Sequence, residues 1–216
     1  MGTSRQRADF YFDPMCPWAW ITSRWVVEVQ RQRPYEVGWR FISLKVINQN
    51  QAADWYTPEY RAGHMAGMHA HRVCDEVRLR HGNSEVGALY TAIGESLHPG
   101  RRRAELVADP QAFMGEMLQR CGLDTSLASH VHDESHDEHI VAETEAAFAR
   151  TGRDVGTPII TFHPGAANEG SFFGPVIAEI PRGDAALRLW DAIEVIATTS
   201  GMAELKRSLR SAPKFD

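Results

Sequence analysis

Residues 8–20 read Ala-Asp-Phe-Tyr-Phe-Asp-Pro-Met-Cys-Pro-Trp-Ala-Trp. The first six alternate and are rich in aromatic side chains, which predicts a buried strand over residues 8–13. Pro14 ends this strand. Pro17 then opens a helix, because a proline in the first helical turn lacks only an N–H that would be unpaired anyway. Cys16 is therefore predicted to be the N-cap residue of that helix.

The chain continues outward from this stretch as a strand–helix–strand unit. Pro34 ends the helix, and residues 36–44 read as a second strand, which predicts a parallel pairing. No convincing strand follows over about 48–151, where amphipathic helical pieces occupy 58–80, 85–97, 104–121 and 126–150. Strand character returns at 154–162 with a hairpin partner at 170–175, and helices are predicted at 184–199 and 204–210.

This order of elements predicts one α/β fold that carries a large all-helical insertion. We expect residues 1–47 and 152–216 to form the sheet-containing domain and residues 48–151 to form the inserted helical subdomain. A chain of 216 residues with 43% hydrophobic side chains is long enough to bury a sizeable core.

Composition narrows the function classes. The formal net charge of -5 argues against a general affinity for nucleic acid. No apolar run approaches a membrane span, and the first residues lack the apolar segment of a signal peptide. Three scattered cysteines are too few for a disulfide framework, which suits a reducing compartment, and we expect a cytoplasmic protein.

The predicted place of Cys16 gives it a chemical role. Free backbone N–H groups at a helix N-terminus stabilise a thiolate, and they can bring a cysteine pKa from about 8.5 into the range of roughly 3.5 to 7.5. Pro14 and Pro17 hold the residue in a tight turn. We therefore expect Cys16 to be a reactive nucleophile with a low pKa.

Pro158 stands at the start of a predicted strand, in the sequence Gly156-Thr157-Pro158. A proline there would remove a hydrogen bond of the strand ladder unless it serves a special turn. A cis Thr157–Pro158 peptide bond is the expected solution.

The motifs around Cys16 and Pro158 resemble those of the DsbA-like thioredoxin family, in which a cis-proline loop faces the active cysteine. The segments Phe172-Phe-Gly-Pro175 and Ile180-Pro-Arg-Gly183, with the ending Pro213-Lys-Phe-Asp216, resemble the actinobacterial branch of mycothiol-dependent nitroreductases and disulfide reductases. The resemblance runs over nearly the whole chain. It implies a thioredoxin-like fold of the DsbA type, a nucleophile at Cys16 and a cis-proline at Pro158.

The sequence departs from this branch at one position. The helix of the branch opens with Cys-Pro-Trp-Cys, and the second, resolving cysteine maps onto Ala19. A dithiol enzyme closes its own disulfide to release the substrate from the first sulfur, and Ala19 removes that step. Either the protein is a natural monothiol enzyme that needs an external thiol, or Ala19 is an engineered substitution that traps an intermediate.

The other two cysteines are weak candidates for the resolving role. Cys74 and Cys121 both lie in the helical insertion without a partner motif, and a free cysteine behaves mostly as a small hydrophobe. The expected cosubstrate is therefore a low-molecular-weight thiol, mycothiol or glutathione, with no bound cofactor. The other partner is a disulfide or an aromatic electrophile, and the chain is expected to be a monomer or a homodimer.

The resemblance also places a substrate cleft between the Cys16 helix and the inserted helices. Aromatic side chains there would offer flat apolar walls, and an amide, a phenol and an imidazole would orient a polar thiol. The expected binding residues are Pro17, Trp18, Trp20, Asn50, Tyr60, His98 and Thr157.

Ten histidines raise the question of a metal. His132, His136 and His139 follow one another at helical spacing, but the acidic residues between them are typical of a solvated helix face. We expect no metal site.

Three functions fit these observations. The first is a thiol-dependent oxidoreductase in which Cys16 attacks the substrate and a small thiol resolves the adduct. The second is a kappa-type thiol transferase or isomerase, which needs no resolving cysteine and which Ala19 favours. The third is a redox-inactive binding or chaperone-like protein, against which the presence of Cys16, Pro17 and Pro158 argues.

Overall fold

The computed structural model describes residues 6–52, 54–209 and 211–215. Its sheet contains β1 (Gln6–Phe12), β2 (Tyr35–Phe41), β3 (Ile159–Phe162) and β4 (Gly170–Phe173), in the order β2-β1-β3-β4. The pairing of β1 with β2 is parallel, and those of β1 with β3 and β3 with β4 are antiparallel. The strand–helix–strand unit and the later hairpin predicted from the sequence are therefore confirmed.

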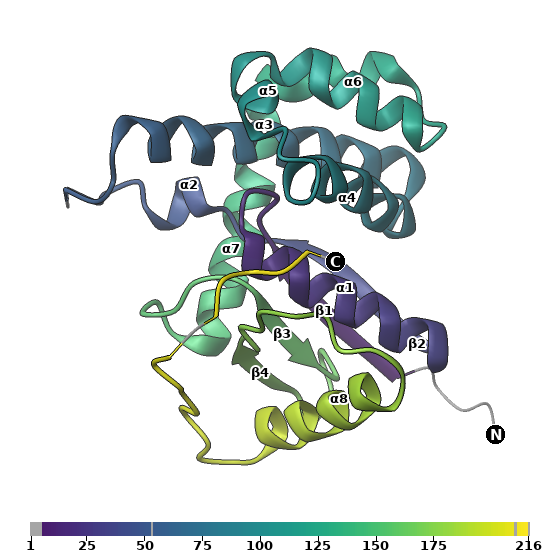
Figure 1. Ribbon diagram of the computed structural model, residues 1–216, viewed down its shortest axis with the longest axis vertical. Helices are drawn as coiled ribbons and strands as arrows, with labels where there is room; N and C mark the ends of the chain where they lie inside the picture. Colours follow the sequence, from purple (N-terminus) through teal and green to yellow (C-terminus); the bar gives the residue numbers. More distant parts are fainter. Residues whose placement is uncertain (1–5, 53, 210, 216) are drawn as a thin grey trace.

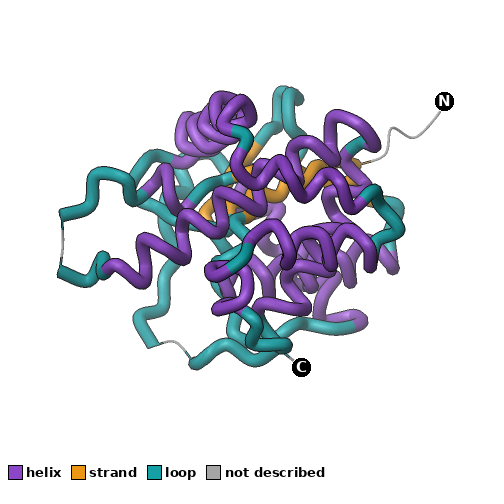
Figure 2. Tube along the Cα trace, turned by 90° about the horizontal axis from the view of Figure 1, so that it is seen from above, coloured by secondary structure: helices purple, strands orange, loops and turns teal. Residues whose placement is uncertain are grey.

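Helices cover both faces of this sheet. On one face, α1 (Pro17–Gln32) packs beside α8 (Gly183–Thr198), with the rings of Trp25 and Trp190 5.3 Å apart. On the other face lies α7 (Asp137–Thr151), whose Phe148 packs in one cluster with Tyr11. The side chains of β1 alternate between the two layers, since Phe10 and Phe12 belong to the core on the α1 side. Seen from above, helices screen most of the sheet (Figure 2).

The remaining helices form a block at one end of the sheet (Figure 1). The order along the chain is α2 (Leu44–Ile47), α3 (Pro58–His81), α4 (Asn83–Leu97), α5 (Arg103–Ala108), α6 (Pro110–Arg120), η1 (Thr125–His132) and η2 (Glu134–His136). Two expected helices are interrupted. The Asp109 side chain caps a new helix at Pro110, and the Asp133 side chain caps another turn at Ser135, so each stretch breaks where an N-cap residue stands.

One hydrophobic core runs through both parts. Phe12 of β1 stacks on Tyr90 of α4 with ring centroids 3.9 Å apart, and both belong to the cluster that holds Trp190 of α8. The last helix of the range 48–151, α7, packs on the sheet itself. The domain boundaries at residues 47 and 151 therefore remain a prediction. By its place in the sequence α7 belongs to the predicted insertion, but in space it covers one face of the sheet.

The C-terminal segment differs from expectation. The helix predicted at 204–210 is wrong over residues 204–209, which contain no helix, while Arg210 lies outside the described residues. Leu205 and Leu209 are exposed, so no packed apolar face stabilises a helix there. The segment instead returns across α1 (Figure 1), where the Lys214 N–H donates to the Ala178 carbonyl at 2.8 Å.

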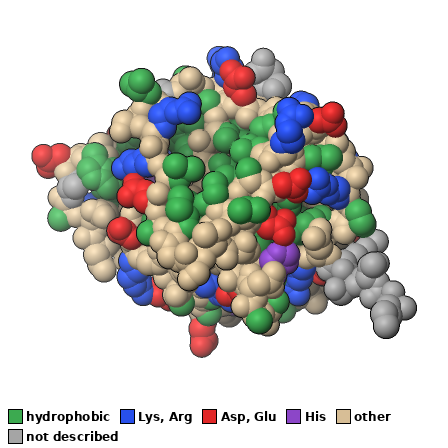
Figure 3. All heavy atoms as spheres, turned by 90° about the horizontal axis from the view of Figure 1, so that it is seen from below, with side chains coloured by type: hydrophobic (Ala, Val, Ile, Leu, Met, Phe, Trp, Pro, Cys, Tyr) green, Lys and Arg blue, Asp and Glu red, His purple; other side chains and the backbone are tan. Residues whose placement is uncertain are grey.

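On the face shown in Figure 3, basic and acidic side chains are interspersed among hydrophobic ones. In the part of the chain that the structure describes, no helix is long and apolar enough to span a bilayer.

Candidate active site

Cys16 caps the N-terminus of α1 and faces the loop before β3. Its Sγ accepts a hydrogen bond from the Ala19 N–H at 3.4 Å and donates one to the Thr157 carbonyl at 3.5 Å. The Thr157–Pro158 peptide bond is cis, the geometry expected from the sequence, and β3 begins directly after it at Ile159. The fold thus brings together the two segments that the sequence singles out.

The electrostatics of Cys16 correct one expectation. Burial raises the pKa of the Cys16 thiol to about 12, the Asp13 carboxylate acts in the same direction, and the N–H groups of Ala19 and Trp18 oppose them. The predicted low pKa is therefore wrong for this conformation. Neutral N–H donors do not offset the cost of placing a thiolate in a site where Cys16 is only 6% exposed.

A buried carboxylate shapes the loop that carries Cys16. Asp13 accepts hydrogen bonds from the backbone N–H of Met15 at 2.8 Å and of Leu44 at 2.7 Å. The Cys16 N–H in turn donates to the Asp13 carbonyl at 3.1 Å. Burial raises the pKa of Asp13 to about 6. The carboxyl group that accepts these two hydrogen bonds therefore titrates near neutrality.

His98 of the α4 terminus supports the same loop from the other side. Its Nε2 lies 3.0 Å from the Pro14 carbonyl, and its ring stacks on Trp20 with centroids 5.8 Å apart. Burial lowers the pKa of His98 to about 4, so the imidazole is neutral at pH 7. Because a carbonyl only accepts, Nε2 carries the proton, and His98 acts here as a donor that holds the loop.

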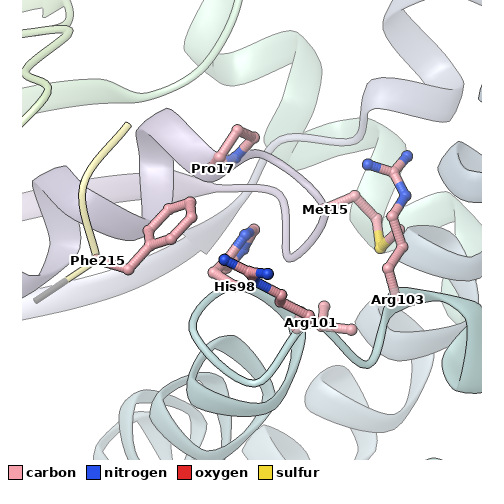
Figure 4. Close-up of a pocket in the computed structure, with 7 residues that line it drawn as sticks. Met15, Pro17, His98, Arg101, Arg103 and Phe215 are labelled. Atoms are coloured by element: carbon pink, nitrogen blue, oxygen red, sulfur yellow. The ribbon is translucent and has the colours of Figure 1, made fainter. Parts of the chain in front are cut away.

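A pocket of about 210 Å³ opens beside Cys16. Met15 and Pro17, the two neighbours of Cys16 in the sequence, form one side, and residues after α4 form the other (Figure 4). The C-terminal Phe215 closes a third side, with its ring 5.6 Å from that of His98. The lining residues are Met15, Pro17, Leu97, His98, Arg101, Arg103 and Phe215.

The expected binding residues divide into three groups. Pro17 and His98 line this pocket, Thr157 contacts the Cys16 sulfur, and Trp18 is half-buried at the start of α1. Trp20 is only 2% exposed and packs on Tyr90 and His98, so it is a core residue and cannot be an open wall.

Asn50 and Tyr60 do not line the pocket beside Cys16. Asn50 lines a separate pocket with Glu145 and Arg153, and the exposed ring of Tyr60 lies near Trp55 and His64. Sequence reasoning missed Arg101, Arg103 and Phe215. The run Arg101-Arg102-Arg103 directly after His98 is the signal that could have pointed to the two arginines.

The two other cysteines are free thiols in packed surroundings. Cys74 is fully buried on α3, where burial raises its pKa, and Cys121 is half-buried at the end of α6, with a pKa raised by the same cause. Neither residue lines the pocket beside Cys16.

One cluster in the described part of the chain could hold a metal ion. Ligand atoms of Glu76, His130 and His136 lie within 4.8 Å of one another, and buried Asp75 holds His136 by its Nδ1 at 2.9 Å. His132, which the sequence pattern grouped with His136, instead lies against His69. None of these residues lines the pocket beside Cys16. Glu76 lies on α3, His130 on η1 and His136 on η2, so the cluster belongs to the helical block.

A thiol at a helix N-cap, set against the carbonyl that precedes a cis proline and carried by this sheet with its helical block, defines the class of DsbA-like thioredoxin-fold oxidoreductases. Residues 15–207 match the family model of the mycothiol-dependent nitroreductase Rv2466c, and the chain belongs to this family. A curated relative, the uncharacterized protein Rv2286c of Mycobacterium tuberculosis, is 30% identical over 207 residues, which are 92% of this chain and 80% of that protein.

Solved structures support the fold. The cytosolic disulfide reductase DsbM from Pseudomonas aeruginosa aligns with a TM-score of 0.60 at 12% identity, over 88% of this chain and 99% of its own. SCO1869 from Streptomyces coelicolor, described as a probable DsbA oxidoreductase, aligns with a TM-score of 0.56 at 15% identity, over 94% of each chain. The expected fold class and the expected family are therefore confirmed.

Proposed function

We propose that this protein is a monothiol oxidoreductase in which Cys16 forms a covalent adduct with its substrate and a low-molecular-weight thiol, mycothiol, resolves it. The observation that carries the proposal is the position of the Cys16 sulfur between the Ala19 N–H and the Thr157 carbonyl. The membership in a mycothiol-dependent family supports the choice of thiol. The reducing compartment implied is the cytoplasm.

The first step is a thiol–disulfide exchange at Cys16. The sulfur attacks one sulfur of a disulfide R–S–S–R′, a Cys16–S–S–R bond forms, and the R′ sulfur leaves with the proton that Cys16 carried. The N–H groups of Trp18 and Ala19 stabilise the charge on the Cys16 sulfur during the exchange, since both lower its pKa. The neighbouring Thr157 carbonyl fixes the direction from which the substrate approaches.

The second step needs a thiol from outside the chain. Ala19 is fully buried and carries no sulfur, Cys74 is fully buried elsewhere, and the half-buried Cys121 at the end of α6 does not line the pocket. A mycothiol thiolate therefore attacks the R sulfur of the adduct, forms a mycothiol–S–S–R disulfide and restores the Cys16 thiolate. A solved structure of DsbM with GSH supports a small thiol as the cosubstrate of this fold.

Mass spectrometry tests this proposal directly. The protein is incubated with the disulfide of mycothiol and mapped by peptide, and one mycothiol adduct on Cys16 is expected, which added mycothiol removes. The variant Cys16→Ser should lose both the adduct and turnover. An adduct on Cys74 or Cys121 alone, or full turnover without an added thiol, contradicts the mechanism.

Ala19 also favours a second function, a kappa-type thiol transferase or isomerase. In that reaction the Cys16 region activates a bound thiol, and no disulfide forms on the enzyme. The Cys16→Ser variant and the search for an adduct on Cys16 distinguish the transferase from the oxidoreductase. A transferase would show thiol-dependent activity on an aromatic electrophile without an adduct on Cys16, whereas an oxidoreductase passes through that adduct in every cycle.

A further inference from the structure

We propose that the pocket beside Cys16 binds a carboxylate of the molecule that reacts at the Cys16 sulfur, and that Arg101 and Arg103 supply the charges that recognise it. The inference rests on the proposed function for the reactivity of Cys16. It adds a substrate class, an anion with an apolar body, to the site.

The first observation is the contrast within the run of three arginines. Arg102 forms ion pairs with Glu105 and Glu116, both at 2.6–2.7 Å, and it does not line the pocket. In the described part of the chain, no carboxylate is in ion-pair contact with Arg101 or Arg103, and both of these line the pocket. In a chain of net charge -5, two cations at one pocket without an ion-pair partner among the described residues are the electrostatic complement of an anion.

The second observation is the position of the Arg103 side chain. Its guanidinium lies against α3 at Gly63, where a Cβ atom would stand only 2.3 Å from Nη2. Gly63 thus leaves the room that the arginine occupies. Arg103 extends from the start of α5 beside Met15 (Figure 4), and although the residue itself is exposed, its guanidinium lies next to the Cys16 loop in the space left by the buried Gly63.

The groups that face Arg103 leave its charge available. His64 and His98 both have pKa values lowered to about 4, mainly by burial and further by Arg103, so both are neutral at pH 7. The Asp13 carboxyl also interacts electrostatically with Arg103, but its two oxygens already accept the N–H groups of Met15 and Leu44. Among the described residues that line the pocket, none carries a carboxylate that would compete with that of a ligand.

The third observation is the backbone of Arg101. Its φ of 57° lies in the left-handed region, which few residues other than glycine adopt. Such a conformation persists only where the surrounding structure holds it. Arg101 and His98 both line the pocket and are labelled in Figure 4.

The rest of the pocket is apolar and aromatic. Pro17, Leu97 and Phe215 line it together with the neutral ring of His98. Such walls bind the flat or aliphatic body of a ligand, while the two guanidinium groups donate hydrogen bonds to its carboxylate. Because Met15 and Pro17, the two neighbours of Cys16 in the sequence, also line the pocket, a ligand bound there lies next to the loop that carries Cys16.

The experiment compares two alkylating reagents of nearly equal size, anionic iodoacetate and neutral iodoacetamide. Each forms a Cys16–S–CH₂ bond and releases iodide, and peptide mapping reports the label on Cys16 alone. The ratio of the two rates cancels any change in the reactivity of the sulfur. In the double variant Arg101→Ala/Arg103→Ala this ratio is expected to fall by about threefold to tenfold. The ratio in the unmodified protein should also fall as salt is added.

The matched control is Arg102→Ala, which removes the same side chain from the adjacent position. Its ratio should remain at the unmodified value, and circular dichroism checks that all variants are folded. An unchanged ratio in the double variant, or an equal fall in Arg102→Ala, overturns the inference.

A second measurement separates the source of the carboxylate. With glutathione attached to Cys16, its release by anionic 3-mercaptopropionate is compared with its release by neutral 2-mercaptoethanol. A loss only in the alkylation ratio assigns the carboxylate to the electrophile, which is the result expected with mycothiol, a thiol without a carboxylate. A loss of preference for the anionic thiol in the double variant assigns the carboxylate to the resolving thiol and excludes mycothiol from that role.

A binding measurement keeps the inference separate from the proposed function. Calorimetric titration of Cys16→Ser with benzoate and with benzamide needs no reactive thiol. Preferential binding of benzoate that disappears in the double arginine variant supports the pocket even if Cys16 proves unreactive. Equal, or equally absent, binding of the two compounds counts against it.

Discussion

The Sγ atom of Cys16 lies 3.5 Å from the carbonyl oxygen of Thr157, 141 residues further along the chain. This contact joins the first helix to the start of β3 and gives the Cys16 thiol a carbonyl acceptor, while the Ala19 N–H donates to the same sulfur. The thiol can donate to this carbonyl, whereas a thiolate cannot. The contact therefore favours the protonated form, in agreement with the raised pKa of Cys16.

The first prediction concerns the pH dependence of Cys16 alkylation. Because the Cys16 pKa is raised to about 12, the thiolate fraction should grow about tenfold per pH unit from pH 6 to pH 9, without a plateau. The measurement is the rate of iodoacetamide labelling of Cys16 against pH, with free cysteine as the control. A plateau below pH 7 would mean that the helix N-terminus outweighs burial.

The second prediction concerns His98. Its Nε2–H supports the Pro14 carbonyl in the loop before Cys16. Loss of this bond in His98→Ala should weaken the loop by about 1 kcal/mol and slow the exchange at Cys16 several-fold. His98→Gln, which keeps an N–H donor, should restore part of the rate. If the alanine variant exchanges at the unmodified rate, the bond has no influence on Cys16.

The third prediction compares two helical glycines. A Cβ at Gly94 would lie 2.1 Å from the buried Trp20 ring, whereas one at Gly115 would meet only Ala128 Cβ at 3.8 Å. Gly94→Ala should therefore lower the free energy of unfolding by about 1–3 kcal/mol or more. Gly115→Ala should raise it by up to about 1 kcal/mol through helix propensity. Urea unfolding of both variants measures these effects, and equal stabilities would contradict the packing argument.

The sequence predicted the sheet and the place of Cys16 because local signals there act together. Alternating aromatics in β1, a proline in the first turn of α1 and the strand-opening Pro158 all point to one arrangement. The helical block was less predictable at its breaks. Asp109 and Asp133 act as caps inside stretches whose apolar pattern continues, and capping overrides periodicity there.

The pocket was predicted only in part, because two of its sides depend on long-range contacts. Phe215 reaches it by the return of the C-terminal segment, and Arg103 by the space that Gly63 leaves on α3. Neither neighbour is visible in a local pattern. The prediction that Trp20 forms an open wall of the substrate cleft was wrong for the same reason, because only the structure shows that α4 and His98 cover its ring.

The fourth prediction is a loss of stability in acid. His71 is fully buried and its Nε2 lies 3.1 Å from the Phe12 carbonyl, and burial lowers its pKa to about 4. The unfolded chain binds a proton at its ordinary pKa of about 6.5, so this stabilisation is complete above pH 6.5 and is lost as the pH falls to 4, by about 3 kcal/mol. His64 and His98 shift in the same direction.

Asp13 acts in the opposite direction over part of this range. Its pKa is raised to about 6, so the folded chain gains stability from it as the pH falls from 6 to 4. Three histidines outweigh one carboxyl group, and a net loss is expected. Thermal unfolding at pH 7 and pH 4.5 measures it, and His71→Phe should show a smaller difference. A protein more stable at pH 4.5 would contradict the prediction.

The last prediction concerns Ala19, whose N–H donates to the Cys16 sulfur while its side chain is fully buried. Residues at i and i+3 lie on one face of a helix, so Ala19→Cys should place a second thiol beside the first. Mild oxidation should then form an intramolecular disulfide between them and remove two hydrogens from the mass. Turnover should no longer need the same external thiol to resolve the adduct, because the introduced thiol performs that step. The unmodified protein, oxidised in parallel, should keep its mass or gain an adduct on Cys16. If it loses two hydrogens within one chain, Cys74 or Cys121 is the resolving residue and the monothiol mechanism is wrong.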